Sequence, residues 1–229
     1  ADKPLAFADL GAEENPALGV RGLRLQRERD DLLTDQLTAL ARAREATGAE
    51  VWVMAPMVAT ADEAAWFAAR CRDAGLPTAG TMVEVPAAAL RSAHVLEACD
   101  FASIGTNDLS QYLFAADRMN GALAHLLSGW QPALWELIVA TVRGADGKPV
   151  GICGEVGGDP LLALVAAGAG VSSLSMAVGK VGSVKASLAR HDLDTCRAML
   201  DAVLASRSPE AARAAVVDLL DPEVAGVLA

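Results

Sequence analysis

The sequence has 229 residues, 53% of them hydrophobic, so it is long enough to bury a sizeable core without disulfides or metals. Nineteen basic residues face 29 acidic ones, and the net charge of −10 disfavours a nucleic acid or an anionic membrane surface as the main partner. The longest apolar stretch, residues 161–171, is too short to span a bilayer, and no signal-peptide pattern opens the chain. We therefore expect a soluble, cytoplasmic protein without membrane insertion.

Short apolar runs alternate with longer amphipathic segments along the chain. In chain order, the apolar runs predict strands at 51–56, 81–85, 101–105, 150–153 and 172–176. The amphipathic segments predict helices at 32–45, 60–73, 87–97, 133–142, 160–167, 193–205 and 209–220. Thr60 ahead of Asp62 and Glu63 is typical of a helix start, and Pro160 is expected in a first turn. The alternation predicts an α/β fold with a parallel sheet, in a single domain over residues 1–229.

Three of the predicted strands end in polar residues at their carboxyl edge. Glu84 lies within the run at 81–85, residues 106–108 follow the next run, and residues 153–155 end the run at 150–153. Each group alone could be a helix cap, and for Asn107 or Asp108 that interpretation is as good as a functional one. The carboxyl ends of parallel strands meet at one edge of a sheet, however, so three such groups favour a site there.

The residue types in these groups indicate a chemistry. Glu84 and Asp108 are hard oxygen donors on successive strands, and two carboxylates with waters and a substrate are a common way to hold Mg²⁺. Arg21 and Arg118 could bind phosphate or carboxylate through their guanidinium forks. The simpler alternatives are an arginine partner or a helix cap for each carboxylate, and a solvated surface position for each arginine.

The four cysteines are widely scattered, with no CxxC pair, so they do not form a disulfide framework. The default interpretation of each is a small buried hydrophobic residue. Cys153 differs from the other three because it lies at the end of a predicted strand, among the polar groups.

Three long strings carry a family resemblance: MVEVPAAAL at 82–90, IGTNDLSQYLFAADRMN at 104–120 and GICGEVGGDP at 151–160. Together they closely resemble the C-terminal domain of Enzyme I, the phosphoenolpyruvate–protein phosphotransferase of the bacterial sugar phosphotransferase system. The strings at 1–7, 13–24 and 174–185 resemble the same domain, so the resemblance extends along nearly the whole chain. Pyruvate phosphate dikinase and phosphoenolpyruvate synthase share the core motifs, but PAAAL and the QY–AADR stretch look more like Enzyme I.

This resemblance implies a fold, a reaction and a set of site residues. The fold would be a TIM-type (β/α)₈ barrel of the phosphoenolpyruvate/pyruvate superfamily, lacking its first strands because only five are found here. The reaction would transfer a phosphoryl group from phosphoenolpyruvate to a protein histidine and yield pyruvate, with Mg²⁺ as cofactor. Glu84 and Asp108 match the Mg²⁺ ligands, Asn107, Arg118 and Arg21 match residues that bind phosphoenolpyruvate, and Cys153 matches the acid that protonates the enolpyruvate carbon. A homodimer is implied by the resemblance alone.

The chain also departs from the family pattern. The phosphorylatable histidine of Enzyme I, which passes the phosphoryl group to a phosphocarrier protein, lies in a separate domain that this sequence lacks. No arginine precedes Arg21, so two further phosphate-binding arginines of the family are absent. We expect the chain to be a fragment of a longer protein; a natural short homologue and a barrel completed by a second chain are the alternatives.

Two other functions are compatible with the sequence. One is a non-catalytic module for phosphoenolpyruvate binding and dimerisation. Upstream sequence with a phosphohistidine domain and two further strand-end arginines would favour the phosphotransferase over this module. The other is a carbon–carbon lyase of the wider barrel group, which also places a Glu and an Asp around Mg²⁺. The GTND motif with Asn107 and the CGE motif with Cys153 argue against the lyase.

Overall fold

The predicted parallel sheet is present in the computed structural model, which describes residues 11 and 13–223. Within these residues the sheet has five strands that pair in chain order, each parallel to the next. They are β1 (Trp52–Ala55), β2 (Thr78–Val83), β3 (Phe101–Gly105), β4 (Val150–Cys153) and β5 (Ser173–Leu174). This confirms the predicted α/β class. Because the strands are parallel, all five of their carboxyl ends lie at one edge of the sheet. That residues 1–229 form a single domain stays a prediction.

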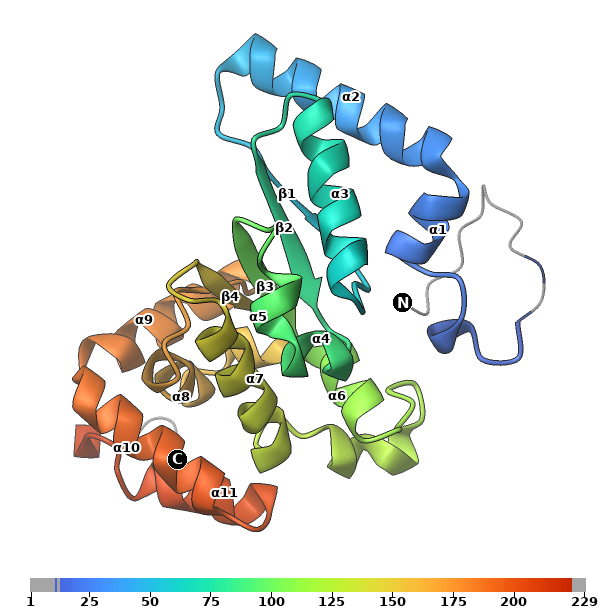
Figure 1. Cartoon of the computed structure of the whole chain (residues 1–229). Coiled ribbons are helices and arrows are strands. Elements are labelled where there is room, and N and C mark those ends of the chain that lie inside the picture. The colour runs from blue at the N-terminus through green and yellow to red at the C-terminus, as the bar shows by residue number, and fades with distance from the viewer. Residues whose placement is uncertain (1–10, 12, 224–229) are drawn as a thin grey trace.

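Helices connect the strands and cover one face of the sheet (Figure 1). The α-helices are α1 (Leu23–Glu28), α2 (Asp30–Thr47), α3 (Ala61–Asp73), α4 (Pro86–Leu90), α5 (Ser92–Val95), α6 (Thr106–Leu113), α7 (Pro132–Gly144), α8 (Leu162–Gly168), α9 (Val181–Ala189), α10 (Leu193–Ala205) and α11 (Pro209–Val217). Short 3₁₀ helices occur at η1 (Pro16–Leu18), η2 (Gly121–Leu127), η3 (Glu155–Gly158) and η4 (Val178–Lys180). Near the end of the chain, α10 packs against α7, α8 and α11.

The predicted helix start at Thr60 is confirmed by a full capping box. The Thr60 hydroxyl accepts the Glu63 N–H at 3.3 Å, and the Glu63 carboxylate accepts the Thr60 N–H at 3.2 Å. The prediction for Pro160 was wrong, because α8 begins only at Leu162. There the Asp159 carboxylate accepts the N–H groups of Leu161 and Leu162 at 2.8 and 3.1 Å.

Several other boundaries differ from the prediction. The expected helix at 87–97 is two short helices, α4 and α5, separated at Arg91, whose φ of −109° is not helical. Helices α1, α6 and α9 were not predicted, and β5 is shorter than the run at 172–176. Strand β2 ends at Val83, so Glu84 lies just beyond the strand, at the carboxyl edge.

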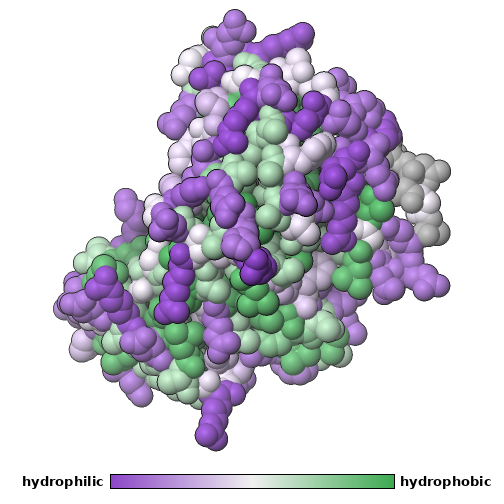
Figure 2. All heavy atoms as spheres, in the orientation of Figure 1, coloured by the Kyte–Doolittle hydropathy of each residue, from purple (hydrophilic) through white to green (hydrophobic). Residues whose placement is uncertain are grey.

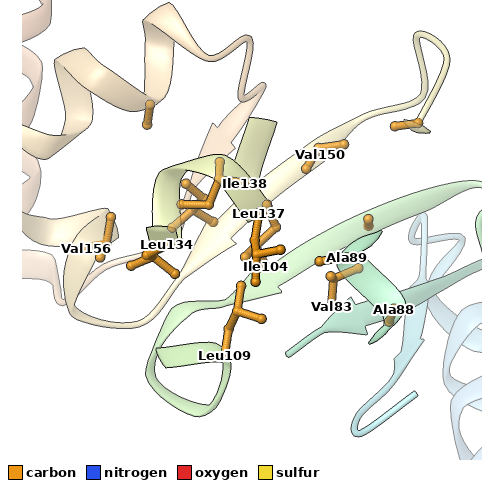
Figure 3. Close-up of a cluster of buried hydrophobic side chains, with 14 of the residues drawn as sticks. Val83, Ala88, Ala89, Ile104, Leu109, Leu134, Leu137, Ile138, Val150 and Val156 are labelled. Atoms are coloured by element: carbon orange, nitrogen blue, oxygen red, sulfur yellow. The ribbon is translucent and has the colours of Figure 1, made fainter. Parts of the chain in front are cut away.

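The core lies between the sheet and the helices. Figure 3 shows Ile104 of β3 close to Leu134, Leu137 and Ile138 of α7, with Val83 of β2 beside α4. Ile104, Leu134 and Ile138 are completely buried. Alternate strand residues point to this face, so the apolar runs that predicted the strands also supply the core.

The opposite face of the sheet carries apolar side chains near the first strands. Trp52 and Met54 of β1 are 49% and 38% exposed, although both are large and hydrophobic. The Trp52 and Phe101 rings lie 4.9 Å apart between centroids, across β2. Gly80 permits this contact, because a Cβ there would lie 2.5 Å from the Phe101 ring. This face is therefore an apolar surface that its own helices do not cover.

Hydrophilic side chains predominate on much of the molecular face seen in Figure 2, most densely in its upper half, whereas hydrophobic ones gather lower down. Among the described residues, no helix is long and apolar enough to cross a membrane.

Lys148 stabilises the turn before β3, at the amino-terminal end of the strands. Its Nζ donates to three carbonyl oxygens of the turn before β3, those of Leu96 at 2.6 Å, Glu97 at 3.3 Å and Cys99 at 2.8 Å. Hydrogen bonds to a charged donor are stronger than neutral ones. We expect Lys148→Met to lower the free energy of unfolding by about 1–3 kcal/mol in a urea titration. The exposed Lys185→Met should change it little, and equal effects of the two variants would contradict this role.

Candidate functional site

The polar groups predicted at the strand ends lie at the carboxyl edge of the sheet. Glu84 directly follows β2, Asn107 and Asp108 lie in the first turn of α6 immediately after β3, and Cys153 is the last residue of β4. The pairing register sets Val83 beside Ile104 and Gly105 beside Cys153, which brings the three strand ends level. One edge therefore carries two carboxylates, an amide and a thiol.

Glu84 is held in a buried position by a backbone donor. Its side chain is only 4% exposed, and Oε1 accepts the Met57 N–H at 2.7 Å. Met57 adopts a left-handed conformation with φ of 61°, which is rare for a residue with a long side chain and here aims its N–H at the carboxylate. Burial, with a smaller contribution from the nearby charge of Asp108, raises the pKa of Glu84 to about 7 despite the opposing hydrogen bond from Met57.

Gly105 makes room for that carboxylate on the neighbouring strand. A Cβ at this position would lie 2.8 Å from Glu84 Oε2 and 3.1 Å from Glu84 Cβ, well inside van der Waals contact. The glycine ends β3, and Thr106, Asn107 and Asp108 follow it in the first turn of α6. The backbone thus lets the Glu84 side chain approach the start of α6.

Asp108 and Arg118 face one another at this edge. Arg118 Nη1 lies 3.7 Å from Asp108 Oδ2, and the two side chains are 26% and 15% exposed. The Arg118 backbone N–H donates to Gln111 Oε1 at 3.0 Å, which fixes the loop after α6 against that helix. Because both Asp108 and Arg118 also influence the pKa of Glu84, the structure brings these three charged groups together.

Asn107 and Cys153 lie on the adjoining strand ends. The Asn107 Oδ1 accepts the Glu155 N–H at 3.5 Å, and the Thr106 hydroxyl donates to the Cys153 carbonyl at 2.9 Å. The N-cap of α6 is Gly105 without a side-chain cap, so neither Asn107 nor Asp108 caps the helix. That excludes the helix-cap interpretation for both, whereas the other alternative for Asp108, an arginine partner, is present in Arg118.

The Cys153 thiol is partly buried and donates weakly to the Ile104 carbonyl, with Sγ 3.4 Å from the oxygen. Burial raises the pKa of Cys153, and the negative charges of Glu84 and Asp108 add to the effect despite an opposing hydrogen bond from Ser103. The thiol is therefore kept in its protonated form beside the carboxylate pair. The other three cysteines are free and buried, as the default interpretation predicted.

Arg21 lies near this edge but pairs with a different residue. Its Nη1 contacts Glu13 Oε2 at 2.8 Å and the Val20 carbonyl at 2.8 Å, and the side chain is 14% exposed. The following residues dock on the connection after β1: the Leu23 N–H donates to the Pro56 carbonyl at 3.1 Å. Arg21 is thus not a solvated surface residue.

Sequence reasoning missed two residues that organise this edge. Met57 acts through its backbone N–H, which leaves no signature in the sequence. Tyr112, the chain's single tyrosine, lies one helical turn after Asp108 on α6, and its hydroxyl lies 3.7 Å from Met57 Sδ. Spacing of four residues from Asp108 would have placed Tyr112 on the same helix face, had α6 been recognised.

A parallel sheet with charged and polar groups at the carboxyl ends of its strands defines the class of α/β proteins that bind a ligand at this edge. Within that class, the chain belongs to a family described as "PEP-utilising enzyme, PEP-binding domain", which matches residues 1–193. This confirms the family resemblance seen in the sequence. One of the strings that carry the resemblance, at 1–7, lies outside the described residues.

Relatives of known name agree with this membership. The chain is 50% identical to the phosphoenolpyruvate-protein phosphotransferase of Streptomyces coelicolor, over 97% of the chain and 41% of that protein. It is 42% identical to the enzyme of that name from Haloferax volcanii, over 89% of the chain and 39% of the relative. It is 40% identical to a multiphosphoryl transfer protein of Xanthomonas campestris, over 93% and 26%. The chain thus spans about two fifths or less of the length of these relatives.

Proposed function

We propose that this chain carries the phosphoenolpyruvate and Mg²⁺ site of an enzyme that transfers a phosphoryl group to a protein histidine and releases pyruvate. This reaction would be the first step of a sugar phosphotransferase system in the cytoplasm, with a phosphocarrier protein as the next acceptor. The observation that supports it most is the grouping of Glu84, Asp108 and Arg118 at one sheet edge, in a chain of the phosphoenolpyruvate-binding family.

The donor set fits a divalent metal ion of the Mg²⁺ type. Glu84 and Asp108 offer hard carboxylate oxygens. Burial and, to a smaller extent, the charge of Asp108 disfavour the ionised form of Glu84, a cost that a bound cation would relieve. Mg²⁺ usually takes only one or two carboxylates and completes its shell with water and substrate oxygens. When bound, it would stabilise the negative charge that develops on the substrate as the phosphoryl group leaves.

The arginines and the amide would bind and orient phosphoenolpyruvate. The Arg118 backbone N–H is bound to the Gln111 side chain of α6, which positions the residue at this edge. Its guanidinium can then point toward the anionic substrate, while Asp108 balances its charge. Asn107 offers a neutral donor at the same sheet edge, and Arg21 would approach from the segment that docks on the connection after β1. Positive charge around the phosphoryl group favours its loose transition state.

Cys153 would supply the proton that completes pyruvate. Once the phosphoryl group has left, the electron pair of the enol oxygen–phosphorus bond is delocalised onto the terminal carbon, which takes a proton from the Sγ–H. A thiol whose pKa is raised remains protonated at neutral pH and is therefore ready to donate.

We also propose that the five strands form part of an eight-stranded barrel and that the complete protein is a homodimer. The strict chain order of the parallel sheet is typical of a barrel segment. The apolar face with Trp52 and Met54 would then face the barrel interior, where the missing strands would cover it.

Calorimetric titration of phosphoenolpyruvate into the purified chain tests the proposed site. We expect saturable binding that requires Mg²⁺, and about tenfold to a hundredfold weaker binding in Arg118→Gln, because a charge-assisted hydrogen bond to the substrate is lost. The matched control is Arg207→Gln, which alters an exposed arginine after α10. A folded chain that gives no saturable heat with Mg²⁺ present would contradict the proposal that it carries this site on its own.

A further inference from the structure

Tyr112 joins three elements that surround the candidate site. It lies on α6 one turn after Asp108, and its hydroxyl donates to the Ala17 carbonyl in η1. The same hydroxyl lies 3.7 Å from Sδ of Met57, the residue whose N–H holds Glu84. A single phenol therefore touches the α6 side, the connection after β1 and the segment that leads to Arg21.

The η1 segment needs such a contact because packing does not hold it. None of its residues, Pro16–Leu18, is buried. A hollow of about 520 Å³ lies between residues 14–18 on one side and residues 111–119 on the other. Arg24 donates to the Leu18 and Gly19 carbonyls at 2.9 and 3.0 Å, but it belongs to α1 on the same side of the hollow. Segments with few buried contacts open at low free energy, so a hydrogen bond that crosses the hollow has a large effect on their position.

The position of η1 determines where Arg21 lies. Arg21 follows η1 after two residues, and the Val20 N–H and the Arg21 guanidinium both bind the Glu13 carboxylate, at 2.7 and 2.8 Å. Gly22 then packs against Met57, where a Cβ would lie 2.9 Å from the Met57 Cβ. Movement of η1 would consequently move Arg21 relative to α6.

We propose that Tyr112 is a positioning residue: its hydroxyl latches η1 onto α6 and so fixes Arg21 relative to Asn107 and Asp108. The inference rests on the proposed function, because it assigns Arg21 to the same phosphoenolpyruvate site. Burial, with the charges of Asp108 and Glu84 nearby, raises the pKa of Tyr112 to about 12, so the phenol remains a donor at physiological pH.

Tyr112→Phe removes only the hydroxyl and tests the latch without any ligand. We expect amide hydrogen exchange at Leu18, Val20 and Leu23 to accelerate about fivefold or more, because these N–H groups are protected within the latched segment. Thr141→Val is the matched control, since it removes a buried hydroxyl that bonds within α7. Unchanged exchange at the three amides in a folded Tyr112→Phe protein would overturn the latch.

A double-mutant cycle on phosphoenolpyruvate binding tests whether the latch acts through Arg21. We expect Tyr112→Phe to weaken binding about fivefold to tenfold in the parent protein, and less than about twofold in an Arg21→Ala background. If Tyr112→Phe weakens binding by the same factor with and without Arg21, or does not change the affinity of the parent protein, the positioning role is overturned. Absence of phosphoenolpyruvate binding by the parent protein would contradict the proposed function instead. The hydrogen-exchange experiment needs no ligand, so it would still test whether the Tyr112 hydroxyl holds η1 against α6.

Discussion

Replacement of Glu84 by glutamine should weaken Mg²⁺-dependent phosphoenolpyruvate binding by about 100-fold or more, because a charged metal ligand is lost. Glutamine keeps an acceptor oxygen for the Met57 N–H and nearly the same shape, so the fold should persist. The same change should make the metal-free protein more stable at alkaline pH. Function and stability would thus respond in opposite directions to one substitution.

The gain in stability follows from the raised pKa of Glu84. A carboxyl with a pKa of about 7 in the folded state and its ordinary 4.5 in the unfolded chain binds its proton more tightly when folded. Stability from this group is therefore full below pH 4.5 and falls as the pH rises toward 7. The loss amounts to roughly 3 kcal/mol above both pKa values, and a neutral glutamine does not incur it.

Urea titrations at pH 5 and pH 8.5 in the presence of EDTA measure this effect. The free energy of unfolding of Glu84→Gln relative to the parent should increase between the two pH values. Glu136→Gln, on the exposed side of α7, is the matched control and should show no such increase. Added Mg²⁺ should stabilise the parent protein but not Glu84→Gln. Parallel pH profiles for parent and variant would show that the Glu84 carboxyl is not destabilised by burial.

Much of this fold could be predicted because the strands are short apolar runs between amphipathic segments. The runs at 101–105 and 150–153 coincide residue for residue with β3 and β4. Helix α6 could not be predicted in the same way, since it follows β3 without a loop and its N-cap, Gly105, makes no side-chain bond. The polar residues of its first turn, Thr106 to Asp108, indicate a site at the strand end but show no helical periodicity.

The location of the candidate site could also be predicted, but not how it is held. Polar residues after apolar strands placed Glu84, Asp108 and Cys153 at one edge, because parallel strands end together. The Met57 N–H that fixes Glu84 is a backbone group, and its left-handed conformation has no signal in a methionine. The pairing of Arg21 with Glu13 depends on how a segment without buried residues folds back, which periodicity does not encode.

The second large effect is expected at Cys153. Cys153→Ser in the complete enzyme should slow pyruvate formation at least about 100-fold, within the range that general acid catalysis supplies, while phosphoenolpyruvate binding changes little. Serine keeps a donor for the Ile104 carbonyl and is close in size, so the local structure should remain. A serine hydroxyl is a much weaker acid than a thiol, and the proton transfer to carbon is therefore the step that fails.

The pH profile distinguishes proton donation from other roles of the thiol. Because burial and the charges of Glu84 and Asp108 raise the pKa of Cys153, the donor form is present throughout the neutral range. Pyruvate formation by the parent enzyme should therefore fall only at pH values above the ordinary range of a cysteine, as the thiol loses its proton. Cys99→Ala removes a buried thiol two residues before β3, at the opposite end of the strand from the site, and should leave both the rate and the profile unchanged. Equal loss of binding and of pyruvate formation in Cys153→Ser would assign the thiol to substrate binding instead of proton transfer.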